Sequence, residues 1–503
     1  MSAPALRAAV RAVLDQLDDD VKDSVIDTLM TRGTKARSGW RPARPSARVV
    51  EEARSFADAA RHMRRRLSSP EITRAPGPSS KRSCRESRAL TSISASTSSS
   101  RRCSESTRGC VAQYAASVFI TTPLGERADA IIRALEQVEG VGTLSSPITD
   151  MEDVCAGALP DLGAFLPLWV KRLERCRPSK DEWETEHERW LREVVYRADG
   201  VEGLERIARK TRRPQSCLAW CDALVDRGDW TAVMSASDVA ARLVCQSHWR
   251  GEILDRRALA AQELGRPDLS RRLEAAWRAA PTLPRLLRWL AADGHERAAI
   301  RAKATKALPR CPKTAARQIG LLRALAGDVS GAAAVLARSL GLGWSNPDHP
   351  GHTLFPLLAT LLSNGTIGDA LVSELETTSR DPLESFAMTD EEHKPTLTTP
   401  AIVPLIQNAC SSVALNDPDR DAVLDAMRVA AEKRVEGILG NSRRRHYGHA
   451  ALLVAACVAY ASQKRATEIL RWAVTLRQQH WRRHAFREEL ARACGSLGVS
   501  IPA

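Results

Sequence analysis

Few residues in this chain favour β-structure. It holds only 4 Tyr and 6 Phe among 503 residues, and its strictly alternating apolar runs are short. Because strands are built from alternating aromatic and β-branched residues, this scarcity predicts an all-α fold. Long apolar runs are also missing: the longest, residues 450–461, falls well short of the roughly 20 residues that a membrane-spanning helix needs. We therefore expect no contact with a membrane.

Cysteine is too sparse for a secreted disulfide scaffold. The 12 Cys residues are scattered, and the nearest pair, Cys217 and Cys221, has the spacing of one helical face and not that of a zinc knuckle. Since no second pair completes a zinc site, buried thiols are favoured and no metal is expected. Residues 1–20 alternate Arg and Asp with apolar residues, so no export segment is expected and the predicted location is the cytoplasm.

Positive charge is in excess but unevenly distributed. The chain has 74 Lys and Arg against 60 Asp and Glu, a net charge of +14, in an ordinary globular composition with 44% apolar residues. Residues 61–110 carry 12 Lys or Arg against three acidic residues, and residues 433–492 carry 13 against four. The rest of the chain is therefore slightly acidic, and an argument for nucleic-acid binding depends on the second segment.

The N-terminal part divides into a helical and a low-complexity segment. In residues 1–63, apolar residues recur with i, i+3, i+4 spacing on both sides of Pro42 and Pro45, which predicts a helical hairpin. Residues 64–110 are dominated by Ser and Arg and cannot bury a core. We interpret them as a flexible linker; the alternatives are a reading-frame artefact and a phosphorylatable or nucleic-acid-binding tail.

Five glycines mark a repeat. Each lies between two apolar helical segments, at intervals of 28, 37, 29 and 33 residues. They are Gly200, Gly228, Gly265, Gly294 and Gly327. Glycine at a helix end adopts the left-handed conformation that reverses the chain. Because one hairpin cannot bury its apolar face alone, we predict an α-helical repeat region of stacked hairpins over residues 111–345.

The segment Ala258–Pro281 resembles a known family. It reads Ala-Leu-Ala-Ala-Gln-Glu-Leu-Gly up to Gly265, followed by Leu273, Trp277 and the closing Pro281. In unit length and glycine position it is similar to degenerate tetratricopeptide repeats, over about residues 190–345. The resemblance implies a helical-hairpin solenoid whose curved groove holds peptides or other proteins and contains no catalytic residues.

The repeats also hold five tryptophans. We expect these side chains to fill the core rather than to stack on a ligand, because large aromatic residues dominate burial in helical cores. They are Trp220, Trp230, Trp249, Trp277 and Trp289.

After a connector of helices and surface loops, residues 346–420, the chain ends in a basic helical segment, residues 421–503. The series Lys433–Leu439, Arg445–Leu453 and Arg483–Leu490 resembles the C-terminal helical region of some bacterial SWIM zinc-finger proteins. The finger itself needs a Cys-x-Cys pair followed by a Cys-x-His pair, which this chain lacks. The resemblance therefore implies a finger-less relative that binds no zinc.

Two basic clusters in the C-terminal segment form the candidate binding site. Arginine suits phosphate or carboxylate partners, and tryptophan can stack on a base. The alternative is a solvated outer face on the last hairpin, since the end of a solenoid needs a polar surface. The candidate interaction residues are Arg443, Arg444, Arg445, Trp481, Arg482 and Arg483.

Histidine pairs provide no catalytic or metal-binding motif. His446 with His449, and His480 with His484, have helical spacing but lack the Glu of a His-Glu-x-x-His motif. We interpret them as surface or interface residues, and the two histidines of the Pro-rich segment 344–352 as ordinary surface-loop residues. Phosphate-binding glycine loops and nucleophile elbows are also missing.

Together these patterns predict a non-catalytic protein-interaction module or assembly scaffold, which binds partner peptides or helices in a solenoid groove. The alternative is a nucleic-acid-associated protein that binds phosphate backbones through the C-terminal basic clusters. A protein partner is expected. Catalytic residues, a cofactor, a metal and a small-molecule substrate are not.

Overall fold

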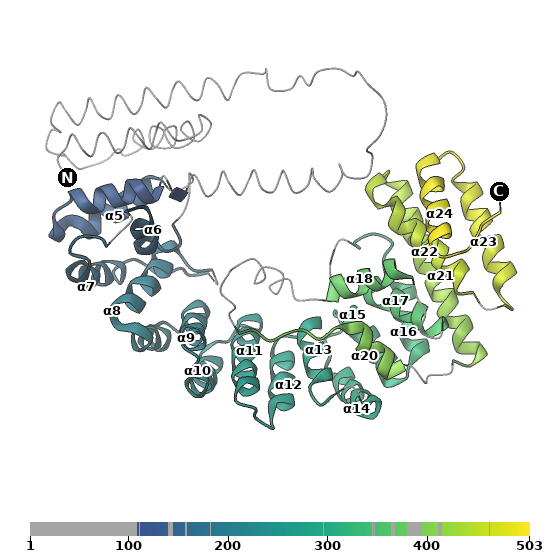
Figure 1. Ribbon diagram of the computed structural model, residues 1–503, viewed down its shortest axis with the longest axis horizontal. Coiled ribbons are helices and arrows are strands. Elements are labelled where there is room, and N and C mark those ends of the chain that lie inside the picture. The colour runs from purple at the N-terminus through teal and green to yellow at the C-terminus, as the bar shows by residue number, and fades with distance from the viewer. Residues whose placement is uncertain are drawn as a thin grey trace, which may run out of the picture. The chain divides into compact units, whose positions relative to one another are not determined.

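The computed structural model describes residues 108–502, except 110, 139–143, 156–157, 182, 295, 345, 347, 364–367, 380–394, 411–414 and 462. Within these residues every regular element is a helix (Figure 1), which confirms the all-α prediction. None of these helices is long and apolar enough to cross a bilayer. The predicted hairpin over 1–63 and nearly all of the linker over 64–110 lie outside the described residues.

The chain divides into two compact units, Met1–Ile207 and Ala208–Ala503. In the first unit, the described helices are residues 111–121, α5 (Leu124–Gln137), α6 (Pro147–Cys155), α7 (Leu162–Leu173) and the start of α8 (Glu186–Thr211). Their core is a ladder of buried aromatic rings. Phe119, Phe165, Trp169 and Trp190 follow one another with ring centroids 4.8, 5.2 and 6.4 Å apart. Edge and tilted ring contacts of this kind add to the burial that stabilises a core.

The second unit is a helical-repeat solenoid. Each helix from α9 to α17 packs on the next one, and α9, α13 and α15 also pack on the next but one, as stacked hairpins do (Figure 1). These helices are α9 (Pro214–Asp226), α10 (Trp230–Leu243), α11 (Ser247–Glu263), α12 (Leu269–Ala279), α13 (Leu283–Ala291), α14 (Arg297–Ala307), α15 (Ala316–Ala326), α16 (Val329–Arg338) and α17 (Gly351–Leu362).

The five glycines of the predicted repeat all have a positive φ, between 60° and 95°, as predicted; four lie at turns between helices, and Gly200 forms a kink inside α8. At two turns the residue after the glycine begins the next helix. Gly327 ends α15, and the Asp328 side chain accepts a hydrogen bond from the Gly331 N–H at the start of α16. Asp229 caps α10 in the same way after Gly228. A Gly-Asp pair therefore ends one helix and starts the next.

Three of the five repeat tryptophans fill the core, as predicted. Trp220, Trp277 and Trp289 are 4%, 0% and 2% exposed, whereas the other two are half-buried. The rings of Trp277 and Trp289 stack with centroids 5.3 Å apart. The Trp277 indole N–H donates to Gln318 on α15 at 2.9 Å, and the Gln318 amide donates to the Pro281 carbonyl at 3.0 Å. These contacts join successive hairpins through both apolar and polar atoms.

Ion pairs join the first helices of three successive hairpins. Arg256 of α11 pairs with Asp222 of α9 and with Glu252 of its own helix, both at 2.8 Å. Glu252 also pairs with Arg285 of α13 at 2.7 Å, and Arg285 pairs with Asp255 at 2.8 Å. Both carboxylates that pair with Arg285 belong to α11. The buried Arg285 guanidinium therefore holds α13 against α11.

Gly251 makes room for that arginine. A Cβ atom at this position of α11 would lie 2.6 Å from the Ala280 Cβ and 2.9 Å from the Arg285 guanidinium carbon. A side chain at residue 251 would therefore displace Arg285 from between the helices.

The solenoid continues into further helices toward the C-terminus. They are α18 (Asp369–Ser379), α20 (Ile402–Cys410), α21 (Asp417–Gly440), α22 (Tyr447–Ala459), α23 (Ala466–Gln479) and α24 (His484–Ser496). Helix α20 packs on α14, α15 and α18, and α21 packs on α16, α17 and α22. Helix α22 packs in turn on α23 and α24, so these last helices share the core of the second unit.

Candidate binding site

The first basic cluster lies in the turn between α21 and α22. Arg443, Arg444 and Arg445 are all exposed. Ser442 has a positive φ of 52°, which reverses the chain after α21, and a short 3-10 helix (Arg444–His446) leads into α22. The turn therefore presents three guanidinium groups to solvent.

The second basic cluster lies in the turn between α23 and α24. The Trp481 side chain is 58% exposed, although most tryptophans among the described residues are buried or half-buried. The Arg482 guanidinium carbon lies 5.1 Å from the centroid of the Trp481 ring, which is within the range of a cation–π contact. Arg483 is exposed as well. This turn adds an aromatic face to the positive charge.

Packing brings the two turns together. Arg483 donates one hydrogen bond to the Leu439 carbonyl at 3.3 Å and another to the Ser442 hydroxyl at 3.5 Å. Helices α22 and α24, which leave the two turns, pack on each other. The six candidate residues therefore form one surface, which we call the basic patch: Arg443, Arg444, Arg445, Trp481, Arg482 and Arg483.

Carboxylates of the described residues do not neutralise the basic patch. Arg483 donates to carbonyl and hydroxyl oxygens and Arg482 lies over the Trp481 ring, but none of the five arginines forms an ion pair with a described carboxylate. Burial, followed by the positive charges of Arg434 and Arg445, lowers the pKa of the nearby His446. Burial and the Arg483 charge likewise lower the pKa of His480. Both shifts favour neutral imidazole, as expected beside uncompensated positive charge.

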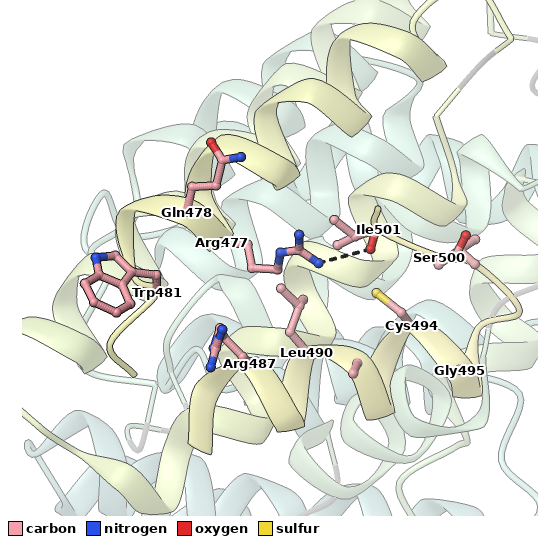
Figure 2. A pocket seen from close by; sticks show the side chains of 11 residues that line it. Arg477, Gln478, Trp481, Arg487, Leu490, Cys494, Gly495, Ser500 and Ile501 are labelled. Atoms are coloured by element: carbon pink, nitrogen blue, oxygen red, sulfur yellow. Dashed lines mark hydrogen bonds between the residues drawn. The ribbon is translucent and has the colours of Figure 1, made fainter. Parts of the chain in front are cut away.

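A pocket of about 500 Å³ lies beside the patch, between α23, α24 and residues 499–501. Trp481 belongs to both the patch and the pocket lining. Figure 2 shows Trp481 at one end of the pocket, Ile501 toward the other, and Arg477 between them. Leu490 and Cys494 of α24 face the same space.

The pocket combines cationic and apolar groups. Arg477 donates from one Nη to the Ile501 carbonyl at 3.2 Å. The Arg487 guanidinium contacts the His484 ring at 2.7 Å, while its Nε–H is buried without a hydrogen-bond partner. Burial raises the pKa of Cys494, which keeps it a thiol. Among the described residues no acidic side chain lines the pocket, and the charged side chains that line it are Arg477 and Arg487.

The sequence analysis missed a buried polar cluster around Glu374 of α18. One carboxylate oxygen of Glu374 lies 2.7 Å from His352 Nδ1 and 3.3 Å from His449 Nε2. The prediction that residues 344–352 form an exposed surface loop is wrong. Trp344, His349 and His352 are only 4%, 8% and 8% exposed. The Trp344 ring packs 4.7 Å from the His449 ring, which draws the loop into the core.

Hydrogen bonding sets the charges in this cluster. His352 Nε2 lies 2.5 Å from the Trp344 carbonyl, so both of its ring nitrogens face acceptor oxygens. Burial opposes ionisation of Glu374, but the hydrogen bonds from His352 and His449 outweigh it and lower its pKa to about 2. Burial lowers the pKa of His349 to about 4. The cluster thus joins the loop to α18 and α22 as a structural junction.

The predicted buried thiols are confirmed. Cys217 and Cys221 are both fully buried, and burial raises their pKa values to about 11 and about 12. Eight cysteines in the described part of the chain are free, Cys217 and Cys221 among them. In that same part, no group of three or more His, Cys, Asp and Glu side chains is arranged to hold a metal ion.

Comparison with known proteins adds little to these observations. No family model and no curated protein matches the chain. Among solved structures, a circular tandem repeat protein with novel repeat topology and enhanced subunit contact surfaces matches with 13% identity, over 99% of this chain and 91% of that one. Its TM-score is 0.17, so the fold assignment depends on the helices described above and not on this match.

Proposed function

We propose that this chain is a non-catalytic protein-interaction module of the cytoplasm, and that its basic patch binds an acidic segment of a partner protein. The observation that supports the proposal is the contact of Arg483 with the α21–α22 turn, which gathers five arginines and Trp481 on one surface. Guanidinium groups match the two oxygens of a carboxylate. Arginine and tryptophan also dominate the binding energy of protein interfaces.

In this proposal the helical repeats are tetratricopeptide-like, in agreement with their hairpin length and glycine turns, and their groove holds a partner peptide or helix. The last helices are related to the helical region of SWIM zinc-finger proteins, without the finger. The free, buried thiols agree with a reducing compartment.

The test is affinity purification from the native cell, with nuclease treatment of the lysate. We expect one protein to be recovered in stoichiometric amount after nuclease. Replacing Arg443, Arg444 and Arg445 by alanine should lower that recovery at least about tenfold, because interface arginines often contribute more than 1 kcal/mol each.

The matched control removes the same charge elsewhere. Arg227, Arg266 and Arg278 are exposed arginines of the repeats, outside the basic patch. Their replacement by alanine should leave recovery unchanged. Loss of all associated material after nuclease would overturn the proposal, and so would equal losses in the two triple variants.

A second candidate function, binding of single-stranded nucleic acid by the same patch, is favoured by the exposed Trp481 ring with Arg482 beside it. Base stacking on such a ring contributes about 1–3 kcal/mol. If this function is the correct one, a labelled oligonucleotide should bind, and its affinity should fall steeply between about 50 and 200 mM salt. Trp481→Ala should then weaken oligonucleotide binding at every salt concentration.

A further inference from the structure

We infer that the pocket between α23, α24 and residues 499–501 is an anchor site for an apolar side chain of the acidic partner segment. This inference rests on the proposed function, because it names how the same partner is held. The basic patch supplies charge recognition, whereas the pocket supplies the burial of an apolar group that an exposed patch cannot provide.

The size of the pocket fits such an occupant. Its volume of about 500 Å³ lies within the range of roughly 300–1,000 Å³ that is typical of ligand sites. A leucine or phenylalanine side chain would fill only part of this space, which leaves room for the flanking backbone. The pocket can therefore take one large residue together with its neighbours in the peptide.

The lining sets the chemistry of the occupant. Leu490 and Cys494 give the pocket an apolar wall, while Arg477 and Arg487 add two guanidinium groups. The Arg487 guanidinium contacts the His484 ring and forms no ion pair with a carboxylate of the described residues, so its charge remains available to an incoming carboxylate. Since no described acidic residue lines the pocket, these groups select an apolar side chain that is flanked by carboxylates.

Trp481 connects the pocket to the basic patch. Its side chain lines the pocket at the end where Figure 2 places it, and it also lies in the turn that carries Arg482 and Arg483. A peptide whose apolar side chain occupies the pocket can therefore continue across Trp481 to the arginines of the patch. This continuity favours an acidic polypeptide over a small isolated ligand.

Gly495 offers a way to close the pocket without disturbing the fold. It lines the pocket on α24, and a Cβ atom added there would meet nothing within 4 Å. Gly495→Leu therefore adds an apolar side chain at the pocket wall with no clash at its Cβ, and it removes none of the arginines. Gly163→Leu is the matched control, because Gly163 is also an exposed helical glycine with open space around its Cβ position.

The experiment measures fluorescence anisotropy of two labelled peptides on the full chain. The first has eight glutamates with one central phenylalanine, and the second has serine in place of that phenylalanine. Burial of the aromatic side chain should make the first peptide bind about tenfold more tightly. Gly495→Leu should abolish this preference but retain binding of the serine peptide, whereas Gly163→Leu should preserve both.

The outcomes separate the two proposals. If both peptides bind equally and Gly495→Leu has no effect, the anchor site is refuted while the function of the basic patch stands. If neither peptide binds, the proposed function fails and the anchor site fails with it. Dodecanoate that displaces the phenylalanine peptide at a similar concentration would instead assign the pocket to a lipid and overturn the inference.

Discussion

Arginine has opposite roles in two regions of the second unit. In the repeats, Arg285 is 5% exposed and is paired with Glu252 and Asp255 of the neighbouring hairpin. In the basic patch, residues such as Arg444 are exposed and have no carboxylate partner in the described part of the chain. The paired arginines of the repeats and the unpaired arginines of the patch contribute equally to the net charge of the chain. Only the second kind can neutralise a ligand, because the charge of the first is already satisfied within the fold.

Breaking a repeat ion pair should have the largest effect on stability. Arg285→Ala leaves Asp255 without its ion-pair partner and Glu252 with Arg256 alone, and burial already raises the pKa of Asp255. We expect the free energy of unfolding to fall by about 4 kcal/mol. Urea denaturation followed by far-UV circular dichroism measures it. A loss of unfolding free energy below about 1 kcal/mol would show that Arg285 stabilises the fold no more than the arginines of the patch do.

The second-largest effect on stability should come from acid, which weakens the Glu374 cluster. The pKa of Glu374 is about 2 in the fold against 4.5 ordinarily, so its stabilisation of roughly 3 kcal/mol is complete above pH 4.5 and is lost as the pH falls toward 2. The pKa of His349 is lowered from 6.5 to about 4, so the unfolded chain takes up its proton first and stability also falls from pH 6.5 to 4.

The variant Glu374→Gln separates these two contributions. In this variant the free energy of unfolding should no longer fall below pH 4.5 through the loss of the Glu374 charge. Its decline between pH 6.5 and 4.5 should remain, because His349 is unchanged. The measurement is the free energy of unfolding in urea at a series of pH values from 7 to 3. An unaltered acid slope in this variant would contradict the assigned charges.

Overpacking beside Arg285 should have an intermediate effect. Gly251→Ala brings a Cβ to 2.6 Å from the Ala280 Cβ, and we expect a loss of about 2 kcal/mol despite the better helix propensity of alanine. Gly495→Ala, where the added Cβ meets nothing, should instead be neutral or stabilise by about 0.5 kcal/mol. Thermal unfolding of the two variants compares them directly; equal shifts would refute the close approach.

Removing a patch arginine should have the smallest effect. Arg444→Ala loses no ion pair within the described residues, so the free energy of unfolding should change by less than about 0.5 kcal/mol. Parallel urea titrations with Arg285→Ala sharpen the comparison, and a comparable loss in both variants would remove the distinction between the two kinds of arginine.

The sequence predicted the features that depend on neighbouring residues. The glycine turns at Gly228 and Gly327 and the buried face with Cys217 and Cys221 follow from local spacing, and the structure confirms them. The arginines of the patch could be named because they occur in runs. Their contact across 41 residues, from Arg483 to Ser442, could not, since it depends on how α22 and α24 pack.

Glu374 shows the same limit more strongly. Its two histidine partners lie 22 and 75 residues away, and no residue near it in the sequence indicates either of them. The segment that leads to His352, at the start of α17, has the Pro and Gly content of a surface turn, so local composition favoured exposure. The segment is buried instead because Trp344 packs against His449 of α22. This contact depends on the tertiary fold and not on local sequence.

The carboxylate of Glu252 also limits how the repeats can be rearranged. Because it serves Arg256 in its own helix and Arg285 in the following hairpin, neither hairpin is a self-contained building block. A hairpin transplanted into another array would carry a buried charge whose counterpart stays behind. Exchange, deletion or duplication of repeats in this chain should therefore succeed only in blocks that keep α11 and α13 together.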